Sequence, residues 1–367
     1  MTIYPALITK ALETVRYPGT GKNIVESGMV EDDIRIDGNR VSFSLIFDKP
    51  TDPFIKSVVK AAEQAVLTFA SPEIDIRGNI AVKTRKPNPV QPENPLPGVK
   101  NIIGVASGKG GVGKSTVAAN LAVALAQEGY KVGLLDADIF GPSIPKMFGV
   151  ENAEIFMHNV EGRDLIIPLE KYGVKLLSIG FLVDKDSPVL WRGSMASTAL
   201  KQLIGQADWG ELDYFVIDMP PGTSDIHLTL VQTLGITGAV IVSTPQEVAL
   251  ADARKGIAMF SGDKVNVPVL GIVENMAWFT PEKHPDERYY IFGNGGAVRL
   301  AEELGIKLLA QIPLVAAVGE HNDAGTPIAA QGTLTAQAFV HLARVVIDAV
   351  DTRNATLPPT LKVQMKP

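Results

Sequence analysis

The sequence predicts an α/β protein: a doubly wound, mostly parallel sheet preceded by a small α+β domain. Short apolar runs alternate with longer helical patterns after residue 100, and strand-like and helix-like segments also mix before residue 85. Alternating strands and helices favour a parallel sheet covered on both faces. Five prolines between Pro87 and Pro97 block helix formation and favour an extended linker. We expect an α+β domain at 1–85, a linker at 86–99, the large domain at 100–350 and a tail at 351–367.

The small domain is predicted from the period of its apolar residues. Ala6–Val15 and Pro53–Phe69 repeat apolar residues at helical spacing, which indicates two helices. Asp33–Ile36 and Val41–Phe47 alternate apolar and polar residues on either side of a glycine-containing turn, as the strands of a hairpin do. Ile74–Val82 alternates again. The expected element order is therefore α-β-β-α-β.

The large domain is predicted from six short apolar runs. Most lack clean alternation, as expected for strands buried on both faces of a parallel sheet. Helical patterns such as Lys114–Glu128 and Leu334–Ala349 separate them. Right-handed crossovers would place the loop after the first strand at the carboxyl edge of the sheet. The expected strands are Asn101–Ala106, Val132–Leu135, Tyr214–Ile217, Ala239–Val242, Val269–Val273 and Leu308–Ile312.

A glycine-rich segment follows the first expected strand and fits the P-loop pattern G-x-x-x-x-G-K-[ST]. Backbone N–H groups of such a loop surround phosphate oxygens, and the next helix directs its N-terminal dipole at them. In this pattern Lys114 reaches the β and γ phosphates, and the Ser115 hydroxyl ligates Mg²⁺. The alternative is a chance glycine-rich turn. We expect ATP and Mg²⁺ as cofactors and nucleotide contacts from Gly108, Lys109, Gly110, Gly111, Val112, Gly113, Lys114, Ser115 and Thr116.

Three aspartates follow buried strands of the predicted sheet. Asp136 and Asp138 end the second strand, and Asp218 ends a later one. A carboxylate in this position points into the ligand crevice. We expect Asp218 to hold Mg²⁺ through its outer shell, Asp138 to orient the attacking water, and Asp136 to support the Mg²⁺ network. The alternative is that these aspartates only cap the helices that follow.

Composition excludes several classes of protein. With 46% hydrophobic and 20% charged residues, the chain resembles an ordinary globular protein, and its net charge of −6 argues against a nucleic-acid partner. We find no apolar run of about 18 residues and no signal peptide, so we expect no membrane partner and a cytoplasmic location. The absence of cysteine excludes disulfides, thiolate catalysis and thiolate metal ligands.

The lysine at position 109 narrows the kind of P-loop. The run K-G-G-V-G-K-S matches K-G-G-x-G-K-[ST], and it resembles the deviant Walker A motif of the MinD/ParA/Fe-protein class of dimeric ATPases. This resemblance implies a homodimer in which Lys109 crosses the interface and contacts the partner's phosphates, in the manner of an arginine finger. By the same resemblance Lys109 joins Lys114 and Asp138 as a catalytic residue.

Longer segments resemble one subgroup of that class, the Mrp (ApbC-type) iron–sulfur cluster carrier ATPases. The matching segments are LDADIFGPS, DMPPGTSD, STPQE, E-N-M and IFGNGG, at Leu135–Ser143, Asp218–Asp225, Ser243–Glu247, Glu274–Met276 and Ile291–Gly296.

The first part of the chain also looks like a known domain. Val15–Val30 and Phe47–Phe54 resemble the SufT/PaaD-like domain that is often fused to Mrp proteins. The two resemblances together imply transfer of iron–sulfur clusters to apoproteins and contact with iron–sulfur assembly proteins. They also imply that Asn275 contacts adenine and that the backbone around Pro313 lines the base pocket; Asn275 could instead be a polar strand terminus.

The sequence departs from the Mrp pattern at the cluster ligands. The family carries Cys-x-x-Cys between the N-M segment and I-F-G, but residues 277–290 contain no thiol. Asp52 replaces the usual cysteine of the first domain. Iron–sulfur clusters are held overwhelmingly by cysteine, so a cluster on this chain is doubtful. His284 with Glu282 and Asp286 could bind a harder metal ion, although an exposed charged loop explains them as well.

Three functional hypotheses remain open. The first is an ATPase of iron–sulfur assembly that delivers clusters without cysteine ligands of its own. The second is a MinD- or ParA-like positioning switch, which needs a membrane-binding tail or a basic face; Pro358 and Pro359 make 351–367 a poor membrane helix. The third is an ATP-driven scaffold for metalloprotein assembly that carries no cluster.

Overall fold

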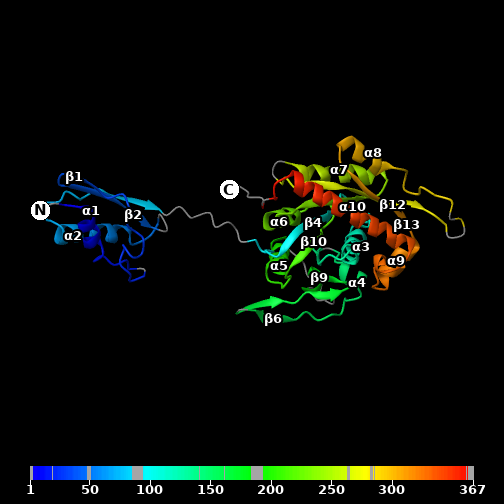
Figure 1. Cartoon of the computed structure of the whole chain (residues 1–367), viewed down its shortest axis with the longest axis horizontal. Helices are drawn as coiled ribbons and strands as arrows, with labels where there is room; N and C mark the ends of the chain where they lie inside the picture. The colour runs from blue at the N-terminus through cyan, green and yellow to red at the C-terminus, as the bar shows by residue number, and fades with distance from the viewer. Residues whose placement is uncertain are drawn as a thin grey trace. The chain divides into compact units, whose positions relative to one another are not determined.

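The chain divides into two compact units, residues 1–93 and 94–367 (Figure 1). The structure is a computed structural model, and it describes residues 3–18, 20–47, 51–84, 94–139, 141–160, 162–182, 193–262, 265–281, 284, 286–360 and 362. Most of the expected linker and the end of the expected tail lie outside the described residues. Within the described part, no helix combines the length and the apolar character that crossing a bilayer requires.

The smaller unit has the expected element order, α1 (Pro5–Leu12), β1 (Arg35–Asp37), β2 (Arg40–Phe47), α2 (Ile55–Phe69) and β3 (Ile80–Thr84). The hairpin prediction is confirmed, because β1 pairs antiparallel with β2. Strand β3 pairs parallel with β2, so the sheet order is β1-β2-β3. Side chains from both helices and from β2 form a separate apolar core, as expected for an independent domain.

The third strand of this unit begins later than we predicted. Asp75 forms an isolated β-bridge with Arg40, residues 77–78 form a turn, and the continuous strand starts at Ile80. Asn79 donates its side-chain amide to the carbonyl of Asp75 at 3.0 Å, and Gly78 has a φ of +75°. Side-chain bonds of this kind offer the backbone an alternative to a sheet ladder, so local turn chemistry overrides the alternating pattern.

The larger unit contains an eight-stranded sheet in the order β13-β12-β11-β4-β10-β5-β9-β8. Every neighbouring pair is parallel except β8 and β9, which confirms the predicted doubly wound, mostly parallel sheet. The strands are β4 (Val99–Ala106), β5 (Val132–Asp136), β8 (Leu169–Lys171), β9 (Val174–Ser178), β10 (Leu212–Asp218), β11 (Gly238–Ser243), β12 (Val269–Phe279) and β13 (Leu308–Leu314).

Helices cover the sheet and enclose two apolar cores (Figure 1). Apolar residues of α5, α6, α7 and α8 contribute to one core, and those of α3, α4 and α10 to the other. The central strands lie between the two, which explains why their apolar runs do not alternate. The helices are α3 (Lys114–Gln127), α4 (Ile144–Met147), α5 (Gly193–Gly205), α6 (Asp225–Thr233), α7 (Glu247–Ser261), α8 (Gly296–Leu304), α9 (Ala316–Asp323) and α10 (Leu334–Thr356), with 3₁₀ turns η1 (Ile179–Leu182) and η2 (Ile328–Ala330).

Several features of this unit were not predicted. Strands β6 (Met157–Val160) and β7 (Arg163–Ile166) form an antiparallel pair outside the main sheet. Strand β12 continues six residues past its expected end, so Asn275 lies inside a strand and not at its terminus. Helix α10 also runs on to Thr356, into the expected tail.

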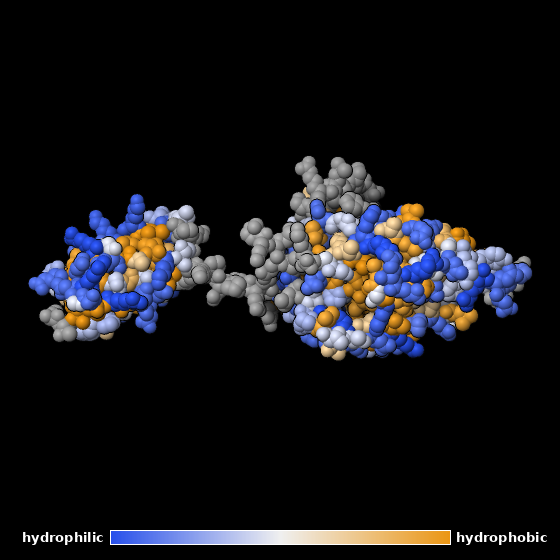
Figure 2. All heavy atoms as spheres, turned by 90° about the horizontal axis from the view of Figure 1, so that it is seen from above, coloured by the Kyte–Doolittle hydropathy of each residue, from blue (hydrophilic) through white to orange (hydrophobic). Residues whose placement is uncertain are grey.

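The tail is anchored to this helix at one point. The buried guanidinium of Arg353 donates to the carbonyl of Pro358 at 2.6 Å and to the hydroxyl of Thr360 at 2.7 Å. On the face shown in Figure 2, polar and apolar residues are interspersed over the surface of the larger unit.

Candidate nucleotide site

The glycine-rich loop connects β4 to α3 at the carboxyl edge of the sheet. Gly113 is the residue before the first turn of α3 and has a φ of +83°, as Gly111 does. Only glycine adopts this left-handed conformation without strain. At Gly108 the constraint is steric, because an added Cβ would lie 2.1 Å from the backbone carbonyl carbon of Asp252. The left-handed backbone at Gly111 and Gly113 and the close packing at Gly108 therefore favour glycine at these three positions.

The loop surrounds a cavity of about 190 Å³. The Lys114 side chain is buried at this cavity, whereas Lys109 is exposed. Three residues that the sequence analysis did not select, Ser107, Met147 and Pro221, also line it. The complete lining is Ser107, Lys109, Gly110, Gly111, Gly113, Lys114, Ser115, Thr116, Asp138, Met147 and Pro221.

The three aspartates converge on Lys114. Asp136 and Asp218 are register partners across the β5–β10 ladder, so both strands deliver a carboxylate to the same edge. The ammonium nitrogen Nζ of Lys114 lies 2.5 Å from Oδ1 of Asp218 and 3.4 Å from Oδ2 of Asp138. It also donates to the Ser115 hydroxyl at 3.2 Å. The structure thus brings the selected aspartates together with Lys114, and Lys109 lines the same cavity from an exposed position.

Burial dominates the electrostatics of this cluster. Asp136 and Asp218 are fully buried. Burial raises the pKa of Asp136 to about 8, with the negative charge of Asp218 as the second cause. Burial also raises the pKa of Asp218, although the ammonium of Lys114 opposes this shift. Because the carboxylates outnumber the single buried lysine, an additional cation would stabilise their ionised forms.

The same cluster offers oxygen atoms to Mg²⁺. Oδ2 of Asp218 is buried and accepts no hydrogen bond from any residue in the described part of the chain. Carboxylate and hydroxyl oxygens are the ligand type that Mg²⁺ prefers. Asp218 and Ser115 therefore fit the ion. Asp136 differs, because its oxygens accept from the N–H groups of Asp138 and Ile144 at 3.1 and 3.2 Å and from the Ser178 hydroxyl at 2.9 Å.

Asn275 reaches the glycine-rich loop from β12. Its amide Nδ2 donates to the carbonyl of Val112 at 2.9 Å, and a Cβ on Gly113 would lie 2.2 Å from the same nitrogen. Ile312, the residue before Pro313, pairs with Asn275 across the β12–β13 ladder. Neither Asn275 nor Pro313 lines the 190 Å³ cavity. Their predicted contacts with adenine stay predictions.

Three polar residues near the site were missed by sequence reasoning. Glu274 is fully buried and accepts from the Ala297 N–H at 2.6 Å and from the Gln311 amide at 2.7 Å. His227 is also buried, and Asn322 donates to Thr116 in the first turn of α3. Glu274 belongs to a segment that we had noted, but no pattern in the sequence distinguishes Asn322.

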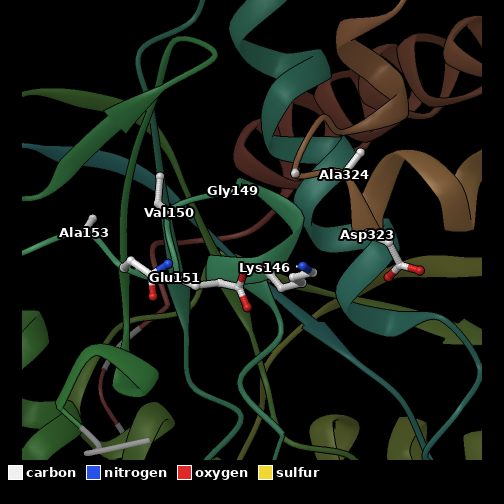
Figure 3. A pocket seen from close by; sticks show the side chains of 9 residues that line it. Lys146, Gly149, Val150, Glu151, Ala153, Asp323 and Ala324 are labelled. Atoms are coloured by element: carbon white, nitrogen blue, oxygen red, sulfur yellow. Dashed lines mark ion pairs between the residues drawn. The ribbon is translucent and has the colours of Figure 1, made fainter.

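A larger hollow of about 360 Å³ lies between α4 and the turn after α9 (Figure 3). Lys146 and Asp323 line it from these two elements. The two linings have no residue in common, although Lys146 is adjacent in sequence to Met147. We take the smaller cavity as the candidate nucleotide site, because it is formed by the glycine-rich loop after β4, by the buried Lys114 and by Asp138 after β5.

The segment that replaces the Cys-x-x-Cys pair forms an aromatic and charged loop. Arg288 lies over the ring of Trp278 at 4.5 Å, and Phe279 and Tyr289 exchange two backbone hydrogen bonds of 2.8 Å. His284 lies 3.2 Å from Glu287, whereas Glu282 falls outside the described residues. The residues with described positions contain no group of three His, Asp or Glu that could hold a metal ion.

Asp52, which replaces the usual cysteine of the small unit, has local partners. One of its oxygens accepts from the Tyr17 hydroxyl at 2.5 Å, and the other accepts from the Phe54 N–H at 2.8 Å. The carboxylate therefore fixes the start of α2.

A buried lysine at the start of a helix, a glycine loop after a parallel strand and aspartates on the adjacent strands define the larger unit as a P-loop nucleotide-binding domain. Comparison with known protein families identifies the family within this class. Residues 98–347 match the family of NUBPL iron-transfer P-loop NTPases, and the chain belongs to that family. Residues 6–75 match a second family, described as iron–sulfur cluster assembly proteins.

Individual relatives agree with this assignment. The chain is 44% identical to an iron–sulfur cluster carrier protein of Synechocystis sp., over 88% of this chain and 90% of the relative. It is 41% identical to an iron–sulfur cluster carrier protein of Aquifex aeolicus, over 93% and 96% of the two chains. Among solved structures, it resembles a nucleotide-binding protein of Archaeoglobus fulgidus in complex with ADP, with a TM-score of 0.56, 41% identity and coverage of 64% and 90%.

Proposed function

We propose that this protein binds and hydrolyses Mg²⁺-ATP and uses the reaction in the transfer of iron–sulfur clusters to apoproteins. The observation that carries the nucleotide part is the buried Lys114 at the P-loop cavity, 2.5 Å from Asp218. The relatives are named iron–sulfur cluster carrier proteins, which supports the proposed role in cluster transfer. The proposed setting is the cytosol, where thiols of client proteins stay reduced.

The proposed mechanism needs positioning and charge neutralisation. Backbone N–H groups of the glycine loop surround the phosphates, and Lys114 neutralises charge on the β and γ groups. Ser115 and Asp218 hold the Mg²⁺ ion, which when bound neutralises charge on the phosphates. Asp138, at the same cavity, orients the attacking water. Asp136 acts indirectly, because its hydrogen bonds to the N–H groups of Asp138 and Ile144 fix the loop after β5.

We also propose a homodimer that completes the site. Lys109 is exposed, and its ammonium makes no hydrogen bond or ion pair that involves a described residue. A lysine in that position is available to the phosphates bound by a second copy of the chain. Such a contact stabilises charge in the transition state more than in the ground state, which is the requirement for a larger kcat.

The adenine contacts are proposed for Asn275 and the backbone at Pro313. Asn275 already donates to the Val112 carbonyl, so its side chain is fixed beside the loop that would hold the phosphates. The ladder between β12 and β13 places the Pro313 segment next to it.

The absence of cysteine limits the cargo part of the proposal. Cluster iron is bound by thiolates, and this chain has none to offer. We therefore propose that thiols of the client or of an assembly protein hold the cluster during transfer. The same observation favours a second candidate, an ATP-driven scaffold for metalloprotein assembly that never carries a cluster.

The substitution Lys114→Ala tests the nucleotide site. We expect no measurable ADP binding by titration calorimetry and no ATP turnover, because the cavity loses the positive charge of the buried Lys114. Lys255→Ala is the matched control, since the Lys255 side chain is 75% exposed and pairs with Asp252 on the same helix. Unchanged binding and turnover in Lys114→Ala would reject the assignment.

A further inference from the structure

Asn322 joins α9 to the P-loop helix. Its side-chain amide Nδ2 donates to the hydroxyl oxygen Oγ1 of Thr116 at 3.1 Å, although the two residues lie 206 positions apart. The side chain is 9% exposed. Its oxygen Oδ1 is buried and accepts no hydrogen bond from the residues that the structure describes. A buried polar atom without a hydrogen-bond partner costs stability. We therefore look for a function of Asn322 in the hydrogen bond that its Nδ2 makes to Thr116.

The bond constrains what the Thr116 hydroxyl can do. A hydroxyl has one hydrogen to donate and two lone pairs to accept with. The amide of Asn322 occupies one lone pair, so the hydrogen must point elsewhere. Within the described chain this hydrogen finds no acceptor, and Thr116 lines the P-loop cavity. The hydrogen is thus free for an anionic oxygen that enters the cavity.

Further hydrogen bonds hold this arrangement in place. Asn120 of the P-loop helix donates to the Thr116 carbonyl at 2.9 Å and accepts from the Ala329 N–H at 2.8 Å. Gln127 donates to the Ala329 carbonyl at 2.8 Å. These hydrogen bonds hold the segment from α9 to η2 against α3. Helices α9 and α3 lie next to each other in Figure 1. A partner held this firmly orients a side chain before the ligand arrives, which lowers the cost of binding.

We propose that Asn322 is a positioning residue of the nucleotide site: it fills an acceptor position of Thr116 so that the Thr116 hydroxyl donates to a nucleotide phosphate. The inference rests on the proposed function of the cavity as the nucleotide site. It adds a residue of α9 to a site that the loop and the strand ends otherwise form.

The first test replaces Asn322 by leucine, which has a similar shape but no hydrogen-bonding group. We expect the Kd for ADP to rise about tenfold, the loss of roughly one well-formed hydrogen bond. A contact that is equally strong in the ground state and the transition state changes KM and leaves kcat unchanged. A purely structural role for Asn322 would instead distort the loop and lower kcat. An unchanged Kd, or a fall in kcat alone, would overturn the proposal.

The second test is a double-mutant cycle with Thr116→Val, measured by ADP titration. If Asn322 acts only through the Thr116 hydroxyl, Asn322→Leu has no further effect once that hydroxyl is gone. Additive losses would contradict the inference. Should Asn322→Leu fail to fold, the same cycle is run with Asn322→Asp, which keeps the shape but can only accept. Any charge repulsion by the aspartate is present in both backgrounds and cancels.

Two controls separate this inference from the nucleotide assignment itself. Asp323→Asn changes the next residue, whose side chain faces the larger hollow (Figure 3), and should leave the Kd for ADP at the wild-type value. Lys114→Ala reports on the nucleotide site alone. Loss of binding in Lys114→Ala together with a wild-type Kd in Asn322→Leu rejects only the role of Asn322. Wild-type binding in Lys114→Ala rejects the nucleotide site and the inference with it.

Discussion

The ammonium of Lys114 and the carboxylate of Asp218 form a buried ion pair, with 2.5 Å between Nζ and Oδ1. The side chains are 6% and 0% exposed. The P-loop lysine is thus paired with the residue that we assign to Mg²⁺. Phosphate must compete with Asp218 for this lysine, and Mg²⁺ would take over the released carboxylate. Binding of the nucleotide and binding of the ion are therefore expected to be coupled.

The substitution Asp218→Asn tests this coupling. It removes the charge but keeps the shape, so Lys114 loses its nearest counter-charge and keeps the carboxylate of Asp138 at 3.4 Å. We expect the free protein to lose stability, by less than the roughly 3 kcal/mol that a buried charge without any partner costs. Nucleotide phosphates would restore a counter-charge, so ADP should stabilise the variant more than it stabilises the wild type. Thermal unfolding with and without ADP measures both effects, and equal stabilisation of the two proteins would contradict the model.

The effect of Asp218→Asn on ATP hydrolysis is measured separately. Without the Asp218 carboxylate, Mg²⁺ should no longer accelerate ATP hydrolysis, and kcat should fall about 100-fold or more. A variant with wild-type turnover and the wild-type dependence on Mg²⁺ concentration would remove Asp218 from the metal site.

Lys109→Ala separates hydrolysis from binding. Because we place Lys109 on the phosphates of a second copy, ADP binding should stay within a few-fold of the wild type while turnover is lost. Turnover per chain of the wild type should also rise with protein concentration until the dimer is saturated. Lys131→Ala, at another exposed lysine, is the control. Equal turnover in Lys109→Ala would reject action across a dimer interface.

The missing thiols lead to a direct prediction about cargo. After anaerobic reconstitution with iron and sulfide and removal of small molecules, the isolated protein should carry no stable cluster. The measurement is visible absorption together with iron and sulfide content per chain. A stoichiometric cluster would show that ligands other than cysteine suffice here, and it would overturn our proposal that the thiols come from a client.

His227 makes stability depend on pH. Burial is the main cause that lowers the pKa of its imidazole to about 4, from 6.5 in an unfolded chain. Above pH 6.5 neither state holds this proton, so the full stability is present. As the pH falls towards 4 the unfolded chain takes up a proton that the folded chain does not, and stability is lost. The total loss corresponds to about 3 kcal/mol.

The matched variant for this effect is His227→Asn, whose side chain can still accept from the Ser224 N–H as Nδ1 of His227 does. Urea unfolding between pH 7 and pH 4 should show a smaller loss of stability in the variant. Asp136, whose raised pKa acts in the opposite direction, is present in both proteins and cancels in the comparison. Parallel pH profiles would exclude His227 as the cause.

Local pattern was sufficient to predict the central strands of the main sheet and the position of the glycine loop, whereas β8 and β9 at one end of the sheet were not predicted. The central strands are buried on both faces, so their apolar runs are nearly continuous and easy to recognise. Lys114, Asp136 and Asp218 could also be selected, because a parallel sheet brings strand ends to one edge whatever the details of packing. Their convergence follows from topology, which the alternation of strands and helices predicts.

Other features of the fold and the site could not be predicted from short stretches of sequence. Asn322 reaches Thr116 from 206 residues away, and nothing around it in the sequence marks it as part of a site. The strand expected at Ile74–Val82 shows the opposite failure: its alternating pattern is clear, but a turn at residues 77–78 separates the bridge at Asp75 from the strand that starts at Ile80. The pairing of β6 with β7 was also not predicted, although these strands are neighbours in the sequence.

The close approach of Asn275 to Gly113 restricts how this protein can change over evolutionary time. With the amide nitrogen 2.2 Å from where a Cβ would stand, no side chain fits at position 113 while Asn275 keeps its place. A shorter residue at position 275 would make room but would give up the bond to the Val112 carbonyl. Single replacements at either position are thus disfavoured. Positions 113 and 275 are therefore expected to change together or not at all during evolution.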